Sequence, residues 1–219
     1  VLLVGVAFAC GVLAHVDALN GPAYWKWPWR NLGLVHTLGM LAAPLLLFLI
    51  GWPLLEREPV SRRRALLAVS VLVTVNFSLQ LLGILAHPQG LEFLKAIVQS
   101  PVATSYFSDA QAITHVGAWL RDFHHAHLGL HSATHPPGPI LYYYVWLKWL
   151  GPSTGALAGG LALGAIAALG VAIMYPFAGL WTPDRRTRLY ACAMYALLPA
   201  LIVFLPEFDQ IYPLLAMLT

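Results

Sequence analysis

The chain has 219 residues, of which 59% are hydrophobic and only 10% are charged, and its mean hydropathy is +0.72. About a quarter of the residues of a soluble domain are charged, so this composition excludes an ordinary soluble domain and predicts an integral membrane protein. The net charge is +3, but the arginines cluster in short segments between apolar runs. We therefore interpret them as topology signals and expect no nucleic-acid partner.

The apolar runs predict about five transmembrane helices. A bilayer core needs about 20 mostly apolar residues per helix, and backbone polar groups in lipid must be satisfied within the helix. The predicted helices are about 1–18, 32–55, 65–87, 154–181 and 189–205. We expect an all-α polytopic membrane protein with a structured outer loop. Because apolar runs stand at both ends of the sequence, we also expect an N-terminal fragment of a longer protein.

The basic loops set the expected orientation of these helices. Arginines crowd the segment between the second and third helices: Arg57, Arg62, Arg63 and Arg64. The positive-inside rule places this segment in the cytoplasm, so the third helix crosses outward and residues 88–153 form an outer loop. We divide the chain into 1–64, with the first two helices and the basic loop, and 65–219, with the membrane core.

A short aromatic stretch at 140–150 decides the rest of the topology. At 1.5 Å per residue it is too short to span, and its tyrosines and tryptophans favour the membrane interface. If this stretch did span the membrane, the basic segment 185–188 would lie outside the cell, against the positive-inside rule. We therefore expect an interfacial helix here, and another in the amphipathic stretch 91–98. The last helix then returns to the outer face, which places Glu207 and Asp209 on the same face as Asp109.

Two features of the spanning segments predict close helix packing. Asn76 and Gln80 lie four residues apart on one face of the third helix, and we expect them to form hydrogen bonds between helices. The run from Gly155 to Ile173 is rich in glycine and alanine, and such small residues let neighbouring helices approach closely.

The polar segment 105–151 is the centre of the outer loop. It holds Asp109, Asp122 and six of the nine histidines. Near its middle, His135 is followed by Pro136 and Pro137, which favour a fixed turn because proline restricts both itself and the residue before it. Pro139 is suited to the first turn of a following helix.

These features, taken in order, resemble the GT-C membrane glycosyltransferases. The matching stretches are YFSDAQAITHVGAWL with Asp109, the His135-Pro136-Pro137 turn, the small-residue run 155–173, and ACAMYALLPALIVFLPEFDQIYPLLAML. The nearest resemblance is to bacterial members similar to protein O-mannosyltransferases and lipid A aminoarabinose transferases. It covers roughly 65–219.

The resemblance implies an activity and a set of partners. A sugar would pass, with inversion, from a polyprenyl-phosphate donor to a glycan, lipid or protein acceptor at the outer face of a bacterial plasma membrane. Asp109 would be the general base, although Ala110 follows it where the family often has glutamate. Asp209 would be the second acid. Some members use a divalent cation, so Asp109 and Asp209 are candidate ligands for Mg²⁺ or Mn²⁺.

Four further residues are candidates for substrate binding. His135 belongs to the family turn, and Glu207 competes with Asp209 as the acid near the last helix. Arg121 and Lys148 can meet a lipid-linked phosphate at the membrane interface, or simply extend toward the headgroups. The alternative for Asp109 is also structural, because an aspartate can cap a helix that begins near Ala110.

Two other functions stay open on the sequence alone. A transporter or channel would use the few polar groups of the spanning segments, namely His15, Asp17, Asn76 and Gln80. A metal-binding membrane protein would use His124, His127 and His131, which share one face if that stretch is helical.

Overall fold

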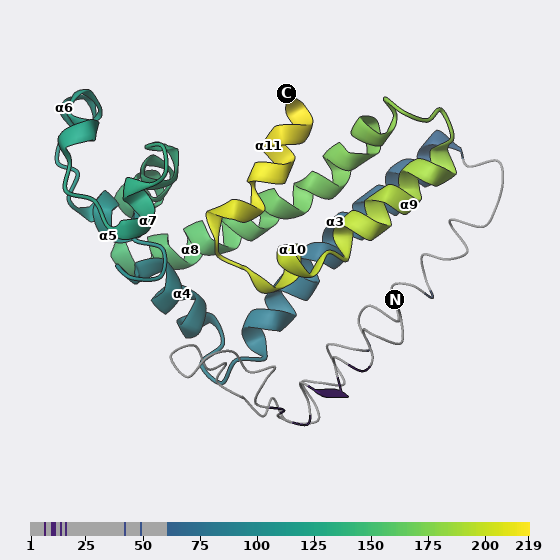
Figure 1. The fold of residues 1–219 in the computed structure, drawn as a ribbon, viewed down its shortest axis with the longest axis horizontal. Coiled ribbons are helices and arrows are strands. Elements are labelled where there is room, and N and C mark those ends of the chain that lie inside the picture. The colour runs from purple at the N-terminus through teal and green to yellow at the C-terminus, as the bar shows by residue number, and fades with distance from the viewer. Residues whose placement is uncertain are drawn as a thin grey trace. The chain divides into compact units, whose positions relative to one another are not determined.

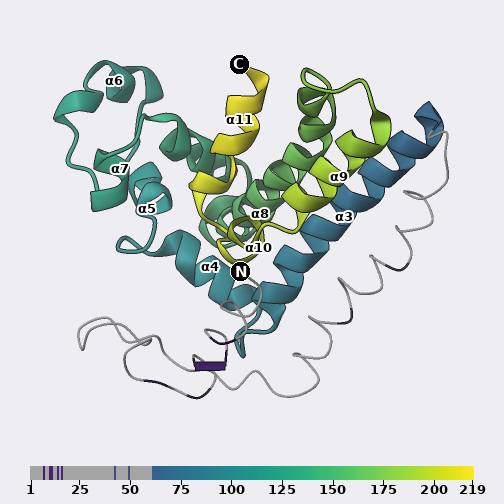
Figure 2. The same cartoon turned by 45° about the vertical axis from the view of Figure 1, so that its right-hand side comes forward.

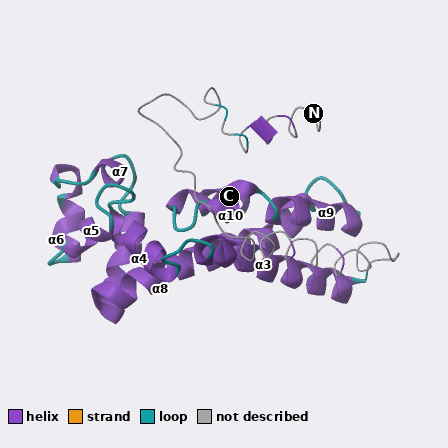
Figure 3. Cartoon of the chain, turned by 90° about the horizontal axis from the view of Figure 1, so that it is seen from below, coloured by secondary structure: helices purple, strands orange, loops and turns teal. Residues whose placement is uncertain are grey.

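The computed structural model describes residues 61–219 without interruption, and before them only the isolated positions 7, 10, 11, 14, 16, 42 and 49. The helices expected at 1–18 and 32–55, with His15 and Asp17, therefore lie outside the described residues. Residues 61–219 all belong to one compact unit. This part of the chain is mostly helical and contains no strand (Figure 3).

The helices of this part are α3 (Arg62–Leu85), α4 (Leu91–Gln99), α5 (Tyr106–Gln111), α6 (Val116–Arg121), η2 (Phe123–His125), α7 (Leu130–Ala133), α8 (Gly138–Ala178), α9 (Arg185–Ala196), α10 (Pro199–Val203), η3 (Phe208–Gln210) and α11 (Tyr212–Leu218). By length and composition, two of them could cross a membrane: α3 and α8. Their apolar character agrees with the expected membrane protein.

Helix α3 confirms the third predicted helix. It begins at its N-cap Ser61, whose hydroxyl accepts a hydrogen bond from the Arg64 backbone N–H. It lies beside α8 and α9 (Figure 1; Figure 2). The core around these three helices consists mainly of small and aliphatic side chains: Ala65, Ala68, Val69, Val171, Leu189, Cys192, Ala196 and Leu201, together with Tyr195.

Asn76 and Gln80 form the hydrogen bonds between helices that their spacing predicts. Both side chains are fully buried. Asn76 Nδ2 donates to the backbone oxygen of Ala196 in α9 at 2.7 Å, and Gln80 Nε2 donates to the backbone oxygen of Gly164 in α8 at 3.2 Å. Gln80 Nε2 also donates to Asn76 Oδ1 at 2.8 Å. The pair therefore fastens α3 to both of its neighbours.

Helix α8 consists of two helical segments that meet at a kink at Gly151. This residue has φ 76° and ψ 178°, a conformation that is open essentially only to glycine. The kink falls between the two expected helices, 140–150 and 154–181. The later segment packs closely on the earlier one, because a Cβ atom on Gly155 would lie 2.5 Å from the Trp146 carbonyl oxygen. Across the same contact, Tyr142 donates a hydrogen bond to the Gly159 backbone oxygen at 2.7 Å.

The single helix expected at 189–205 is wrong. The structure divides this stretch into α9, which ends at Ala196, and the short α10, which begins at Pro199. Leu198 has φ −61° and ψ 123°, which is extended backbone. The cause is Pro199, because proline disfavours a helical conformation at the residue before it and offers no N–H to continue a helix.

The amphipathic stretch 91–98 forms α4, which confirms the helix that was expected there. Its buried face carries Leu94 and Val98, both fully buried. Both side chains lie against Gly160 of α8, where a Cβ atom would come within 3.1 Å of Val98. The small residues of α8 thus admit α4 on one side, as they admit α3 and α9 elsewhere.

Candidate functional site

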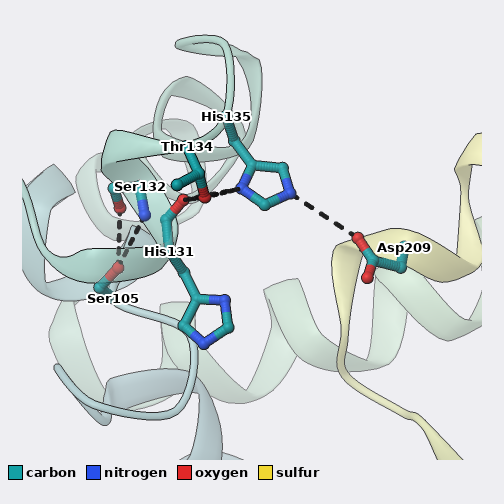
Figure 4. A network of polar contacts seen from close by, with 6 residues as sticks. All are labelled: Ser105, His131, Ser132, Thr134, His135 and Asp209. Atoms are coloured by element: carbon teal, nitrogen blue, oxygen red, sulfur yellow. Dashed lines mark hydrogen bonds and ion pairs between the residues drawn. The ribbon is translucent and has the colours of Figure 1, made fainter.

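The segment between α4 and α8 is built on an unusual residue at the start of α5. Ser105 is buried and has φ 55° and ψ −19°, a left-handed conformation that is uncommon for serine. Its hydroxyl oxygen accepts a hydrogen bond from the Ser132 backbone N–H at 3.0 Å and shares a second one with the Ser132 hydroxyl at 3.0 Å (Figure 4). These bonds join α5 to α7, just before the His-Pro-Pro turn.

Asp109 contacts the same junction through Gly129. Its Oδ2 accepts a hydrogen bond from the Gly129 backbone N–H at 3.0 Å. A Cβ atom on Gly129 would lie 2.4 Å from Ser105 Cβ, so only glycine fits there. Helix α5 begins at Tyr106, and the interpretation of Asp109 as the cap of a helix starting near Ala110 is therefore wrong. The amide that Asp109 holds belongs to the segment before α7.

His135 has a fixed orientation at the His-Pro-Pro turn. Its Nδ1 lies 2.7 Å from the backbone oxygen of His131. Because a carbonyl oxygen only accepts, Nδ1 carries a proton, and Nε2 is the ring nitrogen that is left to face another group. The Tyr106 ring meets His135 edge-on at 5.6 Å between centroids, and the Tyr212 ring lies parallel to it at 6.3 Å.

Nε2 of His135 faces Asp209 across the gap between two distant segments. The distance from Nε2 to Asp209 Oδ1 is 3.8 Å (Figure 4). The Asp209 side chain is 75% exposed, whereas that of His135 is 23% exposed. The structure thus brings the turn before α8 into contact with the acidic segment after α10.

A cavity of about 540 Å³ opens beside this contact. Its polar lining comes from His131, Glu207, Asp209 and Gln210, and its apolar lining from Ala103, Ala200, Leu201, Phe204 and Pro213. Asp109 is not part of this lining. Among the expected site residues, the structure therefore gathers Glu207, Asp209 and His135, and it places Asp109 at the neighbouring junction of α5 with Gly129.

The acidic segment has perturbed protonation. Burial, and secondarily the Asp209 carboxylate, raise the pKa of Glu207 from its usual 4.5 to about 7. Burial is also the main reason that the pKa of Tyr106 lies above its usual range, with Tyr212, Asp209 and Glu207 adding to it. A half-buried carboxyl group that titrates near neutrality can exchange a proton with a ligand in the cavity.

Arg121 and Lys148 lie elsewhere. Arg121 is exposed and is the last residue of α6. Lys148 is exposed in the first segment of α8, and its Nζ lies 5.3 Å from the centre of the Tyr144 ring. Neither residue lines the cavity.

The three histidines proposed as metal ligands do not share a helical face. His124 belongs to η2 and His131 to α7, and residues 127–129 between these helices are not helical. Within residues 61–219 no group of three or more histidine, cysteine or acidic side chains is placed to hold a metal ion. Binding of Mg²⁺ or Mn²⁺ by Asp109 and Asp209 stays a prediction.

Two residues of the site were missed by the sequence analysis. Gln210 is buried, and its Nε2 donates to the backbone oxygens of Leu201 at 2.9 Å and Ala200 at 3.4 Å, which shapes the cavity wall. Phe208 packs edge-on against Tyr106 and Tyr142, at 5.8 Å and 5.3 Å between centroids. The only signal was their position on either side of Asp209 in an apolar stretch.

The described residues thus define a mostly helical protein with two helices that could cross a membrane and a partly acidic cavity beside a His-Pro-Pro turn. The chain matches no protein-family model, no curated protein and no solved structure with which it was compared.

Proposed function

We propose that the chain is a membrane glycosyltransferase of the GT-C kind. It transfers a sugar from a polyprenyl-phosphate donor to an acceptor at the outer membrane face, with inversion. The observation that carries the proposal is the approach of His135 to Asp209 at 3.8 Å. It unites the two acid- and histidine-bearing stretches on which the resemblance to this family rests, and a cavity opens beside them.

In this proposal Asp109 is the general base. One carboxylate oxygen is oriented by the Gly129 N–H at 3.0 Å, and the described residues donate no hydrogen bond to the other. The acceptor hydroxyl gives its proton to this carboxylate as its oxygen attacks the anomeric carbon. A new bond from that carbon to the acceptor oxygen forms, and the bond to the donor phosphate breaks. The phosphate leaves with the electron pair, and attack from the opposite face inverts the anomeric carbon.

The cavity is assigned to the donor sugar. Glu207 titrates near neutrality, so it can donate a hydrogen bond to a sugar oxygen when protonated and accept one when ionised. Asp209 accepts hydrogen bonds from sugar hydroxyls, and His135 lies beside the Asp209 carboxylate at 3.8 Å. Arg121 and Lys148 are proposed to contact lipid phosphates at the membrane surface. No step of this mechanism runs through a metal ion.

The two other functions have less support among the described residues. A transport path would need free polar groups, but the amides of Asn76 and Gln80 donate to backbone oxygens of neighbouring helices. A metal site built on His124, His127 and His131 would need their side chains to converge, and the two short helices that carry the first and last of them are separated by non-helical backbone.

The test is sugar transfer by the full-length protein in proteoliposomes. A panel of labelled polyprenyl-phosphate sugars is supplied with membrane acceptors, and the labelled product is quantified. Asp109→Asn keeps the shape of the side chain but removes the base, and we expect at least a roughly 100-fold lower rate. Asp209→Asn should also reduce transfer.

The matched control is Asp184→Asn, in the connection between α8 and α9. Asp184 caps α9 by accepting hydrogen bonds from the Arg186 and Thr187 N–H groups. Asparagine caps a helix about equally well, so the rate should not change. Full transfer by Asp109→Asn would refute the base assignment. Absence of transfer from every donor by the unsubstituted protein would refute the function.

A further inference from the structure

A second hollow lies in the outer loop, between the end of α5 and η2. Its volume is about 320 Å³, and its lining includes Thr114, His115, Trp119 and Asp122 together with three alanines. No residue lines both this hollow and the cavity beside Asp209. We call it the Trp119 groove. Its volume is at the lower end of the roughly 300–1,000 Å³ found for small-molecule sites.

The polar side chains of the Trp119 groove are not used to build the loop. The turns around it are closed by backbone bonds, from Trp119 N–H to the His115 oxygen at 2.9 Å and from Asp122 N–H to Ala118 oxygen at 3.2 Å. Asp122 precedes η2 without capping it through its side chain. Within residues 61–219, the side chains of Thr114, His115 and Asp122 form no hydrogen bond or ion pair with the protein. Their hydrogen-bonding capacity is therefore available to a ligand.

Trp119 supplies the apolar wall of the groove. Its ring is held by Phe123, which packs edge-on at 5.0 Å between centroids. Helix α6, which carries Trp119, has no fully buried residue, and Val116 and Trp119 are half-buried against the core around Phe107 and Tyr143. Figure 1 and Figure 2 show α6 at the periphery of the outer-loop helices, above α5 and α7.

The charge of the groove restricts its ligand. Asp122 is the only acidic residue of the lining, and no lysine or arginine lines it, so a phosphate group would meet repulsion without compensation. A neutral ring with several hydroxyl groups fits this chemistry. Its hydroxyls can donate to the Asp122 carboxylate and exchange hydrogen bonds with Thr114 and His115, while its C–H face packs against the indole, which is apolar in body and polar at its N–H.

We propose that the Trp119 groove binds a sugar ring. Identifying that ring as part of the acceptor, and so the acceptor as a glycan, rests on the proposed glycosyltransferase function. Sugar binding itself does not depend on that function. The groove would hold the acceptor chain on the outer loop while its reactive hydroxyl reaches Asp109 in the adjoining helix α5.

The test measures sugar binding by the full chain in detergent micelles. Saturation-transfer NMR is recorded with three probes, methyl α-D-mannopyranoside, methyl β-D-glucopyranoside and N-acetylglucosamine, and with tetramethylammonium chloride as a cationic probe. We expect saturation to reach the ring protons of at least one sugar. Asp122→Ala and Thr114→Val should weaken its affinity, the former by about tenfold, which is the loss expected for hydrogen bonds to a charged group. Both side chains are exposed, so both variants should fold.

The matched control is Asp184→Asn, which changes an exposed aspartate outside both the groove and the cavity and should keep sugar binding. Asp209→Ala changes the donor cavity instead. It should lose sugar transfer while the sugar binding that depends on Asp122 persists, so the groove and the proposed function are tested separately. Unchanged affinity in Asp122→Ala, or affinity lost only in Asp209→Ala, would assign the sugar to another site and overturn the proposal. So would binding of tetramethylammonium without any sugar. Sugar binding in a protein that transfers nothing would leave the groove assignment standing and overturn the enzyme.

Discussion

Asn76 and Ala196 are joined by a 2.7 Å hydrogen bond, although 120 positions separate them in the chain. The donor is a fully buried side-chain amide of α3, and the acceptor is the last backbone carbonyl of α9. A carbonyl at a helix end has no partner within its own helix. Asn76 therefore supplies the hydrogen-bond donor that the Ala196 carbonyl lacks where the helix breaks before Pro199. The same bond fixes the position of α9 on α3.

Replacement of Asn76 by leucine should destabilise the protein. The Ala196 oxygen would stay buried without its donor, and Gln80 would lose the partner that it holds at 2.8 Å. We expect the free energy of unfolding to fall by about 1–2 kcal/mol, as measured by SDS titration in mixed micelles. Ser70→Ala, at an exposed position of the same helix, should change it by less than about 0.5 kcal/mol. Equal stability of the two variants would contradict the role of Asn76.

Gly151→Ala should disturb the kink in α8. With φ 76° and ψ 178°, this residue occupies a region that an L side chain enters at a cost of about 1–3 kcal/mol. The control is Gly138→Ala at the start of the same helix, where a Cβ atom would meet nothing within 4 Å. We expect thermal unfolding at a lower temperature for Gly151→Ala alone. If both variants unfold at the temperature of the unsubstituted protein, the kink does not require glycine.

The sequence was sufficient for features that depend on local chemistry. The apolar length of α3, the proline at the start of α8 and the glycine-rich face of that helix all follow from residue type and spacing. The same holds for Asn76 and Gln80, because two buried amides on one helix face need partners on other helices. Proline also explains why the single helix predicted at 189–205 is wrong, since Pro199 carries the signal for a break.

The candidate site could be predicted only in part, because its geometry depends on contacts between distant segments. The left-handed backbone of Ser105 gives no sequence signal, since serine is common in turns of every kind. Nor does spacing reveal that Gly129 must approach Ser105, or that His135 faces Asp209 at 3.8 Å. The resemblance singled out Asp109, His135 and Asp209, but it did not indicate that the cavity excludes the first of them.

Gly129→Ala should impair sugar transfer more than stability. The new Cβ atom would collide with Ser105 Cβ at 2.4 Å, and the segment before α7 would have to withdraw from α5. The hydrogen bond from Gly129 to Asp109 would lengthen, so the proposed base would lose its orientation. A displacement of about 1 Å at a reacting group can lower a rate by roughly 100-fold, and we expect a loss of that order in the proteoliposome assay.

Gly117→Ala is the control for this prediction. It lies in α6, and a Cβ atom there would meet nothing within 4 Å. Alanine also favours the helix more than glycine does, so transfer should persist at the original rate. Full activity of Gly129→Ala would mean that the contact between Asp109 and Gly129 is not needed for transfer.

Stability should depend on pH through Glu207. The folded protein favours the neutral carboxyl group, because burial and the nearby Asp209 raise the pKa of Glu207 to about 7 from its usual 4.5. A group with a raised pKa binds more protons in the folded state than in the unfolded state between these two values. The stabilisation by the neutral Glu207 carboxyl group is therefore complete below pH 4.5, decreases as the pH rises, and is lost above pH 7.

Glu207→Gln removes this titration, so a comparison with this variant isolates the contribution of Glu207. From pH 4.5 to pH 7, we expect the free energy of unfolding of the unsubstituted protein to fall by roughly 1–3 kcal/mol relative to Glu207→Gln. Asp209→Asn should reduce this difference only slightly, because burial is the larger cause. A pH dependence that is identical in Glu207→Gln and the unsubstituted protein would show that Glu207 is not a buried acid.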